Sequence, residues 1–591
     1  MVASGTRIPT EVTASRRAAG ALAAVVLIGC LVYLNALHNP FVYDDHRLIL
    51  ENTSLYRLFD FRTIVLHDMA RPVANLSFAV DYAVWGARPF GFHLTNLLLH
   101  LLNVALLFWL AQRIVVDRAN RGPEASQTGS SAGSVKSTLP VAAAALLAVH
   151  PMLTESVGYA SSRSEVLCAT LFLTAMLCGR RFLIGDGLRW MALTIALWTL
   201  ALGVREVAVM LPVLLLAYSA LLLPESQGGR RRLLTLFLPL VLMAAALVAV
   251  RVVVLSRVEH PGDIAPDWRL ALVELDVMRR YLALFILPIG QAVFHEVAPI
   301  DRLWTPRGAG AIALAVVLLA LAWRTRRASP AFTLGLVWFV LLLVPSAVLV
   351  MLDGGEPMAE HRTYLASFGL FLAAAAVAEW FSDLVNVSGR ARLLTRLTGA
   401  VIIIWLAGHT VLRNAIWRSP VALWVEAVRE SPTHWWPRLL LGQALQEAGL
   451  PAEATAQFRF AISRRPQEPL PYAKLAESLV QLGRFDEAGE ALEQMRARDP
   501  KSPVPFTGLG AVAMLKGDSA RAVQLFEEAL KRDPFNIPAR QGLARLLAAD
   551  HPAEALRLCE ELEQLAPESP AYDECIRGSR AAAQKPGMPP H

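Results

Sequence analysis

The chain has 591 residues, of which 55% are hydrophobic and 18% charged, and its formal net charge at pH 7 is +7. Because this composition is too apolar for a soluble protein of such length, it predicts many membrane-spanning helices. The basic residues fall in short connections between apolar runs, so the positive charge reports membrane topology and does not indicate a nucleic-acid partner.

In chain order, eleven apolar runs approach the length needed to cross a hydrocarbon core of about 30 Å. They lie at residues 18–37, 93–115, 139–158, 164–179, 189–203, 206–223, 233–251, 308–323, 331–351, 364–381 and 397–412. The sequence therefore predicts an all-α, multi-pass membrane bundle over residues 18–412, behind a cytoplasmic segment at residues 1–17. No small-residue cleavage pattern follows the first run, so we expect it to remain as an anchor.

Basic residues recur in every second connection between these runs, and by the positive-inside rule those connections face the cytoplasm. They are Arg16 and Arg17; Arg113, Arg118, Arg121 and Lys136; Arg180 and Arg181; Arg230, Arg231 and Arg232; Arg324, Arg326 and Arg327; and Arg390, Arg392 and Arg396. The opposite connections, among them the long loops 38–92 and 252–307, are then extracytoplasmic, as is the C-terminal region. We expect the chain to lie in a plasma (inner) membrane.

One apolar segment does not fit this alternation. Tyr281 to Phe294 is only 14 residues long, contains Pro288 and Gly290, and follows a charged stretch. That length suits an interfacial or re-entrant helix better than a crossing. If it did cross, every later compartment assignment would be reversed.

The last third of the sequence repeats with a period of 34 residues. The period is kept by Pro432, Pro466, Pro500 and Pro534, by Gly449, Gly483 and Gly517, and by Ala454, Ala488 and Ala522. This spacing resembles tetratricopeptide repeats, which are helix pairs that stack into a solenoid. We expect a repeat domain over residues 419–567 and a partly disordered tail at 568–591. Cys559 and Cys575 are expected to be packed free thiols, or a disulfide in an oxidising compartment.

Ionisable residues gather at the predicted outer helix ends. They are Asp44, Asp45, His46 and Arg47; Arg71; His93 and Asn96; His150 and Glu155; Arg163 and Glu165; Arg205 and Glu206; and Glu360, His361 and Arg362. Acids and cations in one cavity suit sugar transfer from a phosphate-linked donor, because a carboxylate can take the acceptor's proton and cations or a metal ion can hold the departing phosphate. An outer site has no ready supply of nucleotide sugars, so a membrane-embedded lipid phosphate is the natural donor.

Three stretches of the sequence carry a family resemblance. RPVANLSFAVDYAVWGARPFGFHLTNLLLHLLN (Arg71 to Asn103), HPMLTESVGYASSRSEVL (His150 to Leu167) and AEHRTYLAS (Ala359 to Ser367) resemble the transmembrane and tetratricopeptide-repeat-containing proteins of the GT-C glycosyltransferase superfamily. The resemblance implies a polyprenyl- or dolichyl-phosphate monosaccharide as donor and repeats that bind an acceptor protein or glycan. The arginine-rich, lysine-poor composition favours a bacterial relative.

The resemblance also implies which residues carry the chemistry. The family places its catalytic acids in the first outer loop, which matches Asp44 and Asp45, and Glu155 is a further catalytic candidate. One aspartate would act as base while the other orients it or binds a divalent metal ion; the sequence does not rank them. The donor phosphate is expected to contact arginines, whose planar fork fits phosphate oxygens: Arg71, Arg163, Arg205 and Arg362.

Each candidate also has a structural interpretation. Asp44 and Asp45 would form a solvated turn, Glu155 would pair with Arg163, Arg71 would lie on the surface of a loop helix, and Arg205 would neutralise Glu206. The chain would then be a non-catalytic membrane scaffold with protein-binding repeats. A polysaccharide polymerase, ligase or transporter is a third reading, although a transporter would more naturally place its charges at mid-membrane.

Overall fold

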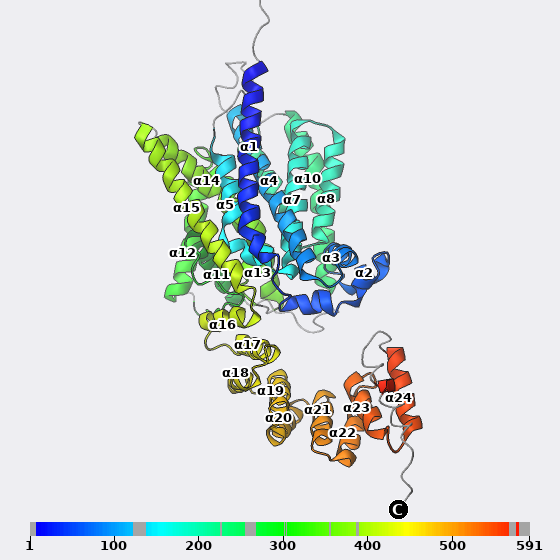
Figure 1. Cartoon of the computed structure of the whole chain (residues 1–591). Coiled ribbons are helices and arrows are strands. Elements are labelled where there is room, and N and C mark those ends of the chain that lie inside the picture. Colours follow the sequence, from blue (N-terminus) through cyan, green and yellow to red (C-terminus); the bar gives the residue numbers. More distant parts are fainter. Residues whose placement is uncertain are drawn as a thin grey trace, which may run out of the picture. The chain divides into compact units, whose positions relative to one another are not determined.

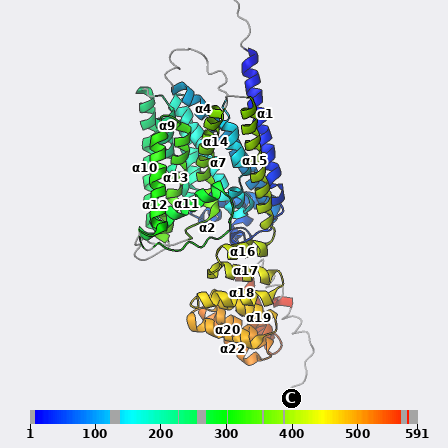
Figure 2. The same cartoon turned by 90° about the vertical axis from the view of Figure 1, so that its left-hand side faces the viewer.

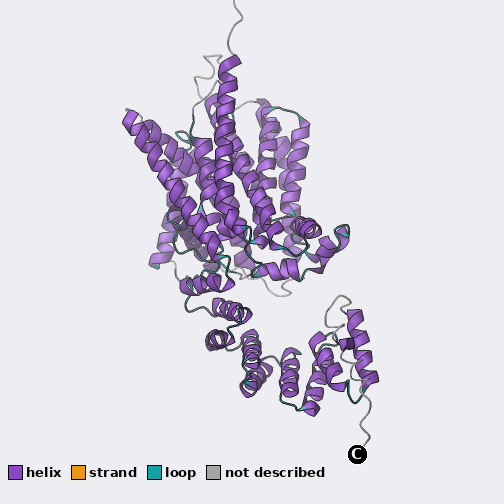
Figure 3. Ribbon diagram, in the orientation of Figure 1, coloured by secondary structure: helices purple, strands orange, loops and turns teal. Residues whose placement is uncertain are grey.

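The computed structural model describes residues 8–121, 137–224, 227–254, 268–300, 302, 304–353, 356–385, 389–565 and 575–577. Within these ranges the chain is helical and contains no β-strand (Figure 3). It divides into two compact units, Met1–Ala422 and Leu423–His591. Residues 122–136 and most of the tail at 568–591 lie outside the described residues. The structure confirms the predicted fold class, an all-α membrane bundle followed by tetratricopeptide repeats.

The first unit is a bundle of long helices that run side by side (Figures 1 and 2). Its α-helices are α1 (Ile8–Tyr33), α2 (Phe61–His67), α3 (Pro72–Trp85), α4 (Pro89–Arg121), α5 (Leu139–Val149), α6 (Thr154–Gly158), α7 (Arg163–Ile184), α8 (Leu188–Leu202), α9 (Leu211–Leu222), α10 (Gln227–Val254), α11 (Trp268–Ile286), α12 (Pro306–Thr325), α13 (Pro330–Asp353), α14 (Tyr364–Val385) and α15 (Gly389–Ile416). Short helices join them: η1 (Leu34–Ala36), η2 (His46–Leu50), η3 (Thr53–Tyr56), η5 (Pro151–Leu153), η6 (Ala160–Ser162), η7 (Glu206–Met210) and η9 (Glu360–Thr363).

All eleven predicted crossings correspond to apolar helices. Eight helices in the described ranges are long and apolar enough to span a membrane, and the segment 188–202 and the segment 206–222 are shorter apolar helices. The remaining crossing, 139–158, is not one continuous helix, because α5 and the segment Pro151–Gly158 meet at an angle of 55°. His150 is extended there, as expected for a residue before proline.

The segment 281–294 is helical only in its first part. Helix α11 ends at Ile286 and, with five charged residues inside it, is not among the apolar spans. Pro288 and Gly290, whose φ is +78°, prevent the helix from continuing. The segment was expected to be an interfacial or re-entrant helix broken at Pro288 and Gly290; it is helical up to Ile286, and residues 287–294 form an irregular strip of chain.

Helices α13 and α14 cross with their backbones in close contact. A Cβ on Gly335 would lie 2.4 Å from the carbonyl oxygen of Gly369, and a Cβ on Gly369 would lie equally close to that of Gly335. Small residues at such a crossing let the two backbones approach, which is how helices commonly pack in membranes. The close pairing fixes the start of α14, where η9 carries part of the candidate site.

The second unit is a series of antiparallel helix pairs. Its helices are α16 (Pro420–Glu430), α17 (Trp435–Glu447), α18 (Pro451–Arg464), α19 (Leu470–Gln481), α20 (Phe485–Arg498), α21 (Val504–Leu515), α22 (Ser519–Arg532), α23 (Ile537–Leu547) and α24 (Pro552–Leu565). The periodic glycines Gly449, Gly483 and Gly517 have φ of +75°, +71° and +84° and end the first helix of each pair. The periodic alanines are buried between helices, so the 34-residue period is explained by packing.

Cys559 and Cys575 form a disulfide. Free thiols were the favoured expectation and were wrong. The Cα atoms of the two cysteines lie 5.6 Å apart, within the range that a disulfide bridges, which a separation of 16 residues in the sequence does not reveal. Disulfides persist in oxidising compartments, so this pair is consistent with a repeat unit outside the cytoplasm.

Candidate functional site

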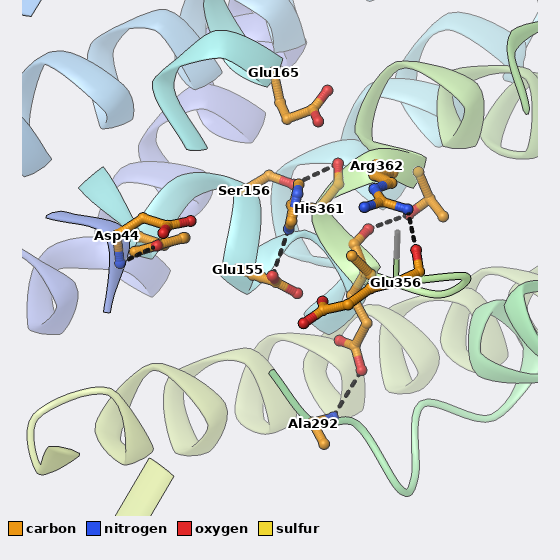
Figure 4. Close-up of polar contacts among 12 residues, drawn as sticks. Asp44, Glu155, Ser156, Glu165, Ala292, Glu356, His361 and Arg362 are labelled. Carbon is orange, nitrogen blue, oxygen red and sulfur yellow. Dashed lines mark hydrogen bonds and ion pairs between the residues drawn. The ribbon is translucent and has the colours of Figure 1, made fainter. Parts of the chain in front are cut away.

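Polar residues from several connections that were predicted to be extracytoplasmic lie close together (Figure 4). The contributing segments are the turn after α1, the corner between α6 and α7, the strip 287–300, and η9 before α14. Hydrogen bonds join these segments directly: Tyr159 contacts Asp44, and His361 contacts Glu155. The expectation that outer helix ends gather their acids and cations is met for most of the named residues.

Asp45 is held inside the protein. Its side chain is 0% exposed, and its carboxylate accepts hydrogen bonds from the Val42 amide (3.1 Å), the Ser161 amide (2.7 Å) and the Ser161 hydroxyl (2.5 Å). Burial raises the pKa of the Asp45 carboxyl to about 7, although the hydrogen bonds from Ser161 and Val42 oppose the rise. Both carboxylate oxygens are therefore engaged in fixing the loop.

Asp44 is in a different position. It is half-buried, its amide donates to the Tyr159 hydroxyl at 2.9 Å, and its carboxylate makes no hydrogen bond or ion pair with any described residue. Figure 4 shows this carboxylate directed toward the side of the cluster that holds Glu155 and His361. Tyr43 just before it has a φ of +52°, a left-handed conformation that costs a bulky residue about 1–3 kcal/mol. The loop thus presents one open carboxylate and buries the other.

Glu155 and Glu360 form a second, deeper pair of acids. Glu155 Oε1 lies 2.5 Å from His361 Nδ1, while its Oε2 is buried without a partner. Glu360 is 0% exposed and accepts hydrogen bonds from Gln291 Nε2 (2.9 Å) and the Ala292 amide (2.8 Å), with His295 Nε2 also 2.9 Å away. Glu360 therefore holds the strip after α11 in place through hydrogen bonds, whereas the Oε2 atom of Glu155 accepts no hydrogen bond.

The guanidinium group of Arg163 is occupied by contacts within the protein. Its guanidinium is buried and lies 2.6 Å from Asp81, and it also donates to Asn96 Oδ1 (2.6 Å) and to the Phe92 carbonyl (2.9 Å). The structural alternative in which Glu155 pairs with Arg163 is not found either, since Asp81 takes that place. Arg163 joins α7 to α3 and α4 and is left out of the candidate phosphate site.

Arg71, Arg205 and Arg362 are the other three arginines named as phosphate contacts. Arg205 Nη2 lies 2.7 Å from Glu165 and its Nε lies 3.9 Å from Glu206, so the expected neutralising pair with Glu206 is only a long contact. Arg71 has no carboxylate within ion-pair distance among the described residues. The nearby charge of Arg205 lowers the pKa of the Arg71 guanidinium. The charges of Glu206 and Glu165 oppose this fall.

Arg362 lies beside Glu356 in the cluster of polar residues (Figure 4). Its Nη1 donates to the Glu356 carbonyl at 2.6 Å. Burial raises the pKa of the Glu356 carboxyl to about 7, the charge of Arg362 opposes the rise, and the charges of Glu155 and Asp44 add to it. Figure 4 shows Asp44, Glu155, Glu356 and Arg362 in one cluster.

The residues present do not fit the expected divalent metal ion. Asp44 and Asp45 were the named ligands, but both oxygens of Asp45 already accept hydrogen bonds from Val42 and Ser161. Across the described residues, no group of three or more His, Cys, Asp or Glu side chains is arranged to hold a metal ion. The proposed reaction uses no metal ion.

Some residues of the site were missed at the level of sequence. Tyr159 and Ser161 lie in a short connection that hydropathy treats as a plain turn, and His295 and Gln291 lie in or beside a segment expected to be helical. His361 was seen at an outer helix end, but nothing in the sequence pairs it with Glu155, 206 residues away. The signal available was the resemblance itself, because the stretches His150 to Leu167 and Ala359 to Ser367 contain three of these five residues.

Comparisons with known proteins agree with the repeats and with the membrane bundle. The tetratricopeptide repeat family model matches residues 445–505 and 513–574. The chain is 30% identical over 210 residues to the protein O-mannosyl-transferase Tmtc1 of Drosophila melanogaster, a match that covers 33% of this chain and 22% of that protein. It is 36% identical over 168 residues to Tmtc3 of the same organism, covering 26% and 18%. The chain thus spans about a fifth of the length of these curated relatives.

Among solved structures, the match to a thermophilic tetratricopeptide-repeat protein of Thermus thermophilus covers 32% of this chain and 96% of that one, at 19% identity and a TM-score of 0.25. This TM-score is too low for the match to say anything about the fold of the whole chain. The chain is therefore TMTC-like: it is similar in sequence to the Tmtc proteins, and it contains tetratricopeptide repeats.

Proposed function

We propose that this TMTC-like chain is a membrane glycosyltransferase that moves a monosaccharide from a polyprenyl-phosphate donor to a hydroxyl of a protein or envelope glycan. The similarity to protein O-mannosyl-transferases supports the reaction class. Eight helices suited to spanning a membrane support a donor that is itself embedded in the bilayer. The site is extracytoplasmic, in a plasma (inner) membrane, with the N-terminus in the cytoplasm.

Asp44 is the general base in this proposal. Its carboxylate is the unengaged member of the acid pair, while both oxygens of Asp45 are used by hydrogen bonds. A base must reach the proton that it removes, which a buried and fully bonded carboxylate does not. Asp45 is therefore assigned to holding the loop.

The transfer is a single displacement. The acceptor oxygen forms a bond to the anomeric carbon of the sugar as its proton passes to Asp44, and the bond from that carbon to the phosphate oxygen breaks with its electron pair. The product carries an inverted anomeric centre, and a polyprenyl phosphate leaves. Arg71, Arg205 and Arg362 hold this phosphate, whose negative charge grows as the bond breaks.

Glu155 is proposed to contact the sugar. Its buried Oε2 has no partner, and an unpaired buried acceptor costs roughly 1–3 kcal/mol. A sugar hydroxyl that donates to this oxygen would remove that cost only when the donor is bound. His361, on the other oxygen, keeps the carboxylate in place.

The repeats are proposed to bind the acceptor. Helix pairs of this kind present an extended surface, and the first helices of successive pairs expose apolar side chains, among them Leu470 (40%), Val504 (45%) and Leu515 (48%). No gathered set of acids or nucleophiles appears in the described part of the repeat unit, so its contribution is recognition. The lipid bilayer and the lipid-linked sugar are the other expected partners.

The observation that carries the proposal is one open carboxylate, Asp44, in the cluster that also holds Glu155 and Arg362 (Figure 4). Mass spectrometry of envelope proteins and glycans from wild-type and deletion strains tests it. We expect a hexose that is present in the wild type, absent in the deletion strain and restored by the intact gene. Identical glycan and protein profiles in the two strains would favour the non-catalytic scaffold.

A further inference from the structure

The corner between α6 and α7, residues Tyr159 to Ser162, is the only part of the described chain outside the first outer loop that bonds to the acid pair. The Tyr159 hydroxyl accepts a hydrogen bond from the Asp44 amide at 2.9 Å. Ser161 donates to Asp45 Oδ1 twice, from its amide at 2.7 Å and from its hydroxyl at 2.5 Å. The partners are 115 and 116 residues apart in the sequence, so these contacts exist only in the folded bundle.

The corner is itself fixed on its far side. Tyr159 is 4% exposed and stacks on Trp417, with ring centroids 5.5 Å apart. The Asn96 side chain donates to the Tyr159 carbonyl at 3.0 Å, and Asn96 also accepts from the buried Arg163 at 2.6 Å. A rigid chain of contacts therefore runs from the Arg163–Asp81 ion pair through Asn96 to Tyr159.

The loop that this corner contacts has a strained backbone at Tyr43. Tyr43 adopts a left-handed backbone with φ of +52°, which a bulky side chain keeps only where surrounding contacts compensate. On either side of Tyr43 the backbone is held by the corner, through Asp44, and by the Val42–Asp45 turn, in which the Asp45 amide donates to the Val42 carbonyl at 3.0 Å. Release of the corner would let the loop relax and would move the Asp44 carboxylate.

We infer that Tyr159 and Ser161 are positioning residues for the acid pair: Ser161 locks Asp45, Tyr159 holds the backbone of Asp44, and together they aim the Asp44 carboxylate at the acceptor. The inference rests on the proposed function, because it assigns no chemistry of its own to the corner. It adds a second segment of the chain, far from the first loop, to the requirements for transfer.

Two conservative variants test it in the full-length protein. Tyr159→Phe keeps the ring on Trp417 and removes only the hydroxyl, and Ser161→Ala removes only the hydroxyl donor to Asp45. Supporting contacts of this kind typically contribute 10–100-fold to activity, and a displacement of about 1 Å can cost 10²-fold in rate. We expect each variant to lower kcat about 10–100-fold while the KM for the donor stays within about threefold.

The matched controls lie away from the site. Tyr218→Phe removes a buried hydroxyl that donates to Asp117, and Ser367→Ala removes a buried hydroxyl that donates to the Tyr364 carbonyl. Both should keep wild-type kcat. Ser161→Thr keeps the hydroxyl and should restore much of the activity lost in Ser161→Ala. The probe is radiolabelled polyprenyl-phosphate mannose, with the membrane fraction of a deletion strain as acceptor.

The decisive comparison repeats Tyr159→Phe and Ser161→Ala in an Asp44→Asn background. Residues that act only through Asp44 should cause no further loss of kcat there, because groups that work as a unit are non-additive. Unchanged kcat in both single variants, or the same fold loss with and without Asp44, would overturn the inference. If Asp44→Asn itself keeps wild-type turnover, the proposed base is wrong, and that failure is distinct from failure of the corner.

Discussion

Two adjacent aspartates have opposite environments in this protein. Asp45 is fully buried and accepts three hydrogen bonds, whereas Asp44 is half-buried and presents an unengaged carboxylate. Sequence alone places both in the first outer loop and does not rank them, because the contacts that separate them come from Ser161 and Tyr159, 116 and 115 residues away. Arg163 is a second case in which the sequence does not reveal the environment. The sequence analysis groups it with the phosphate-binding arginines, whereas in the structure it forms an ion pair with Asp81.

The pKa of Asp45 makes a prediction about stability. Burial raises this pKa from 3.8 to about 7, so between these pH values the folded chain keeps a proton that the unfolded chain has lost. The free energy of unfolding that Asp45 contributes should therefore fall as pH rises from about 4 to 7 and stay constant above 7. Asp45→Asn does not titrate, so the Tm of wild type minus that of the variant should decrease over the same window.

Thermal melts of both proteins in detergent from pH 4 to pH 8 measure this difference. Other titrating groups cancel because they are common to the two proteins. A difference in Tm that is independent of pH, or that grows toward pH 7, would contradict the assignment of Asp45 as a buried, proton-retaining carboxyl.

At the scale of helices, hydropathy predicts where apolar helices lie but not how they break. All eleven predicted runs are helical, since apolar length is the physical requirement for crossing. The bend at His150–Pro151 was not predicted, although proline is present there, whereas Pro288 and Gly290 mark in the sequence the break that follows the end of α11 at Ile286. Such breaks create the site: they bring Glu155 and the strip around Gln291 beside η9, through contacts that no local pattern encodes.

The α13–α14 crossing is predicted to be intolerant of a single methyl group. In Gly335→Ala the new Cβ would lie 2.4 Å from the Gly369 carbonyl oxygen and 2.8 Å from the Ala373 amide nitrogen. Overpacking of this kind costs roughly 1–3 kcal/mol, so Tm in detergent should fall by several degrees. Gly399→Ala, on α15 with nothing within 4 Å, is the control and should leave Tm unchanged or slightly higher. Equal melting of the two variants would mean that the helices do not pack so closely.

At the scale of the whole molecule, the chain consists of a membrane unit and a repeat unit. The 34-residue period alone was enough to predict the second unit, because each helix pair buries the same small residues. Its compartment was predicted from basic residues in the connections of the first unit. The disulfide between Cys559 and Cys575 is an independent observation that favours the same compartment.

The orientation predicts the reactivity of these two cysteines. On intact spheroplasts, a membrane-impermeant maleimide should modify Cys559 and Cys575 only after treatment with an impermeant reductant. Mass spectrometry of the peptides that contain them separates this labelling from that of Cys30, Cys168 and Cys178, which are free thiols. Labelling that needs lysis of the spheroplasts would place the repeats in the cytoplasm and would reverse the topology.

The two units are predicted to have separable tasks. Deletion of residues 433–591 should leave binding of a polyprenyl-phosphate sugar to the membrane unit unchanged, because every residue assigned to the donor lies before that point. Transfer to the native acceptor should be lost. Donor binding is measured on the purified truncation by competition with the radiolabelled lipid. Loss of donor binding in a truncation that still inserts normally would show that the repeats contribute to the donor site.

The central claim is that Asp44 removes the acceptor's proton, and turnover of Asp44→Asn tests it most directly. General-base catalysis typically contributes 10²–10⁴-fold, so transfer from polyprenyl-phosphate mannose should fall by about that factor while donor affinity and membrane levels stay unchanged. Glu51→Gln is the control, because Glu51 is an exposed acid in the same loop, and it should keep wild-type turnover. Wild-type turnover by Asp44→Asn, at normal protein levels, would contradict the account.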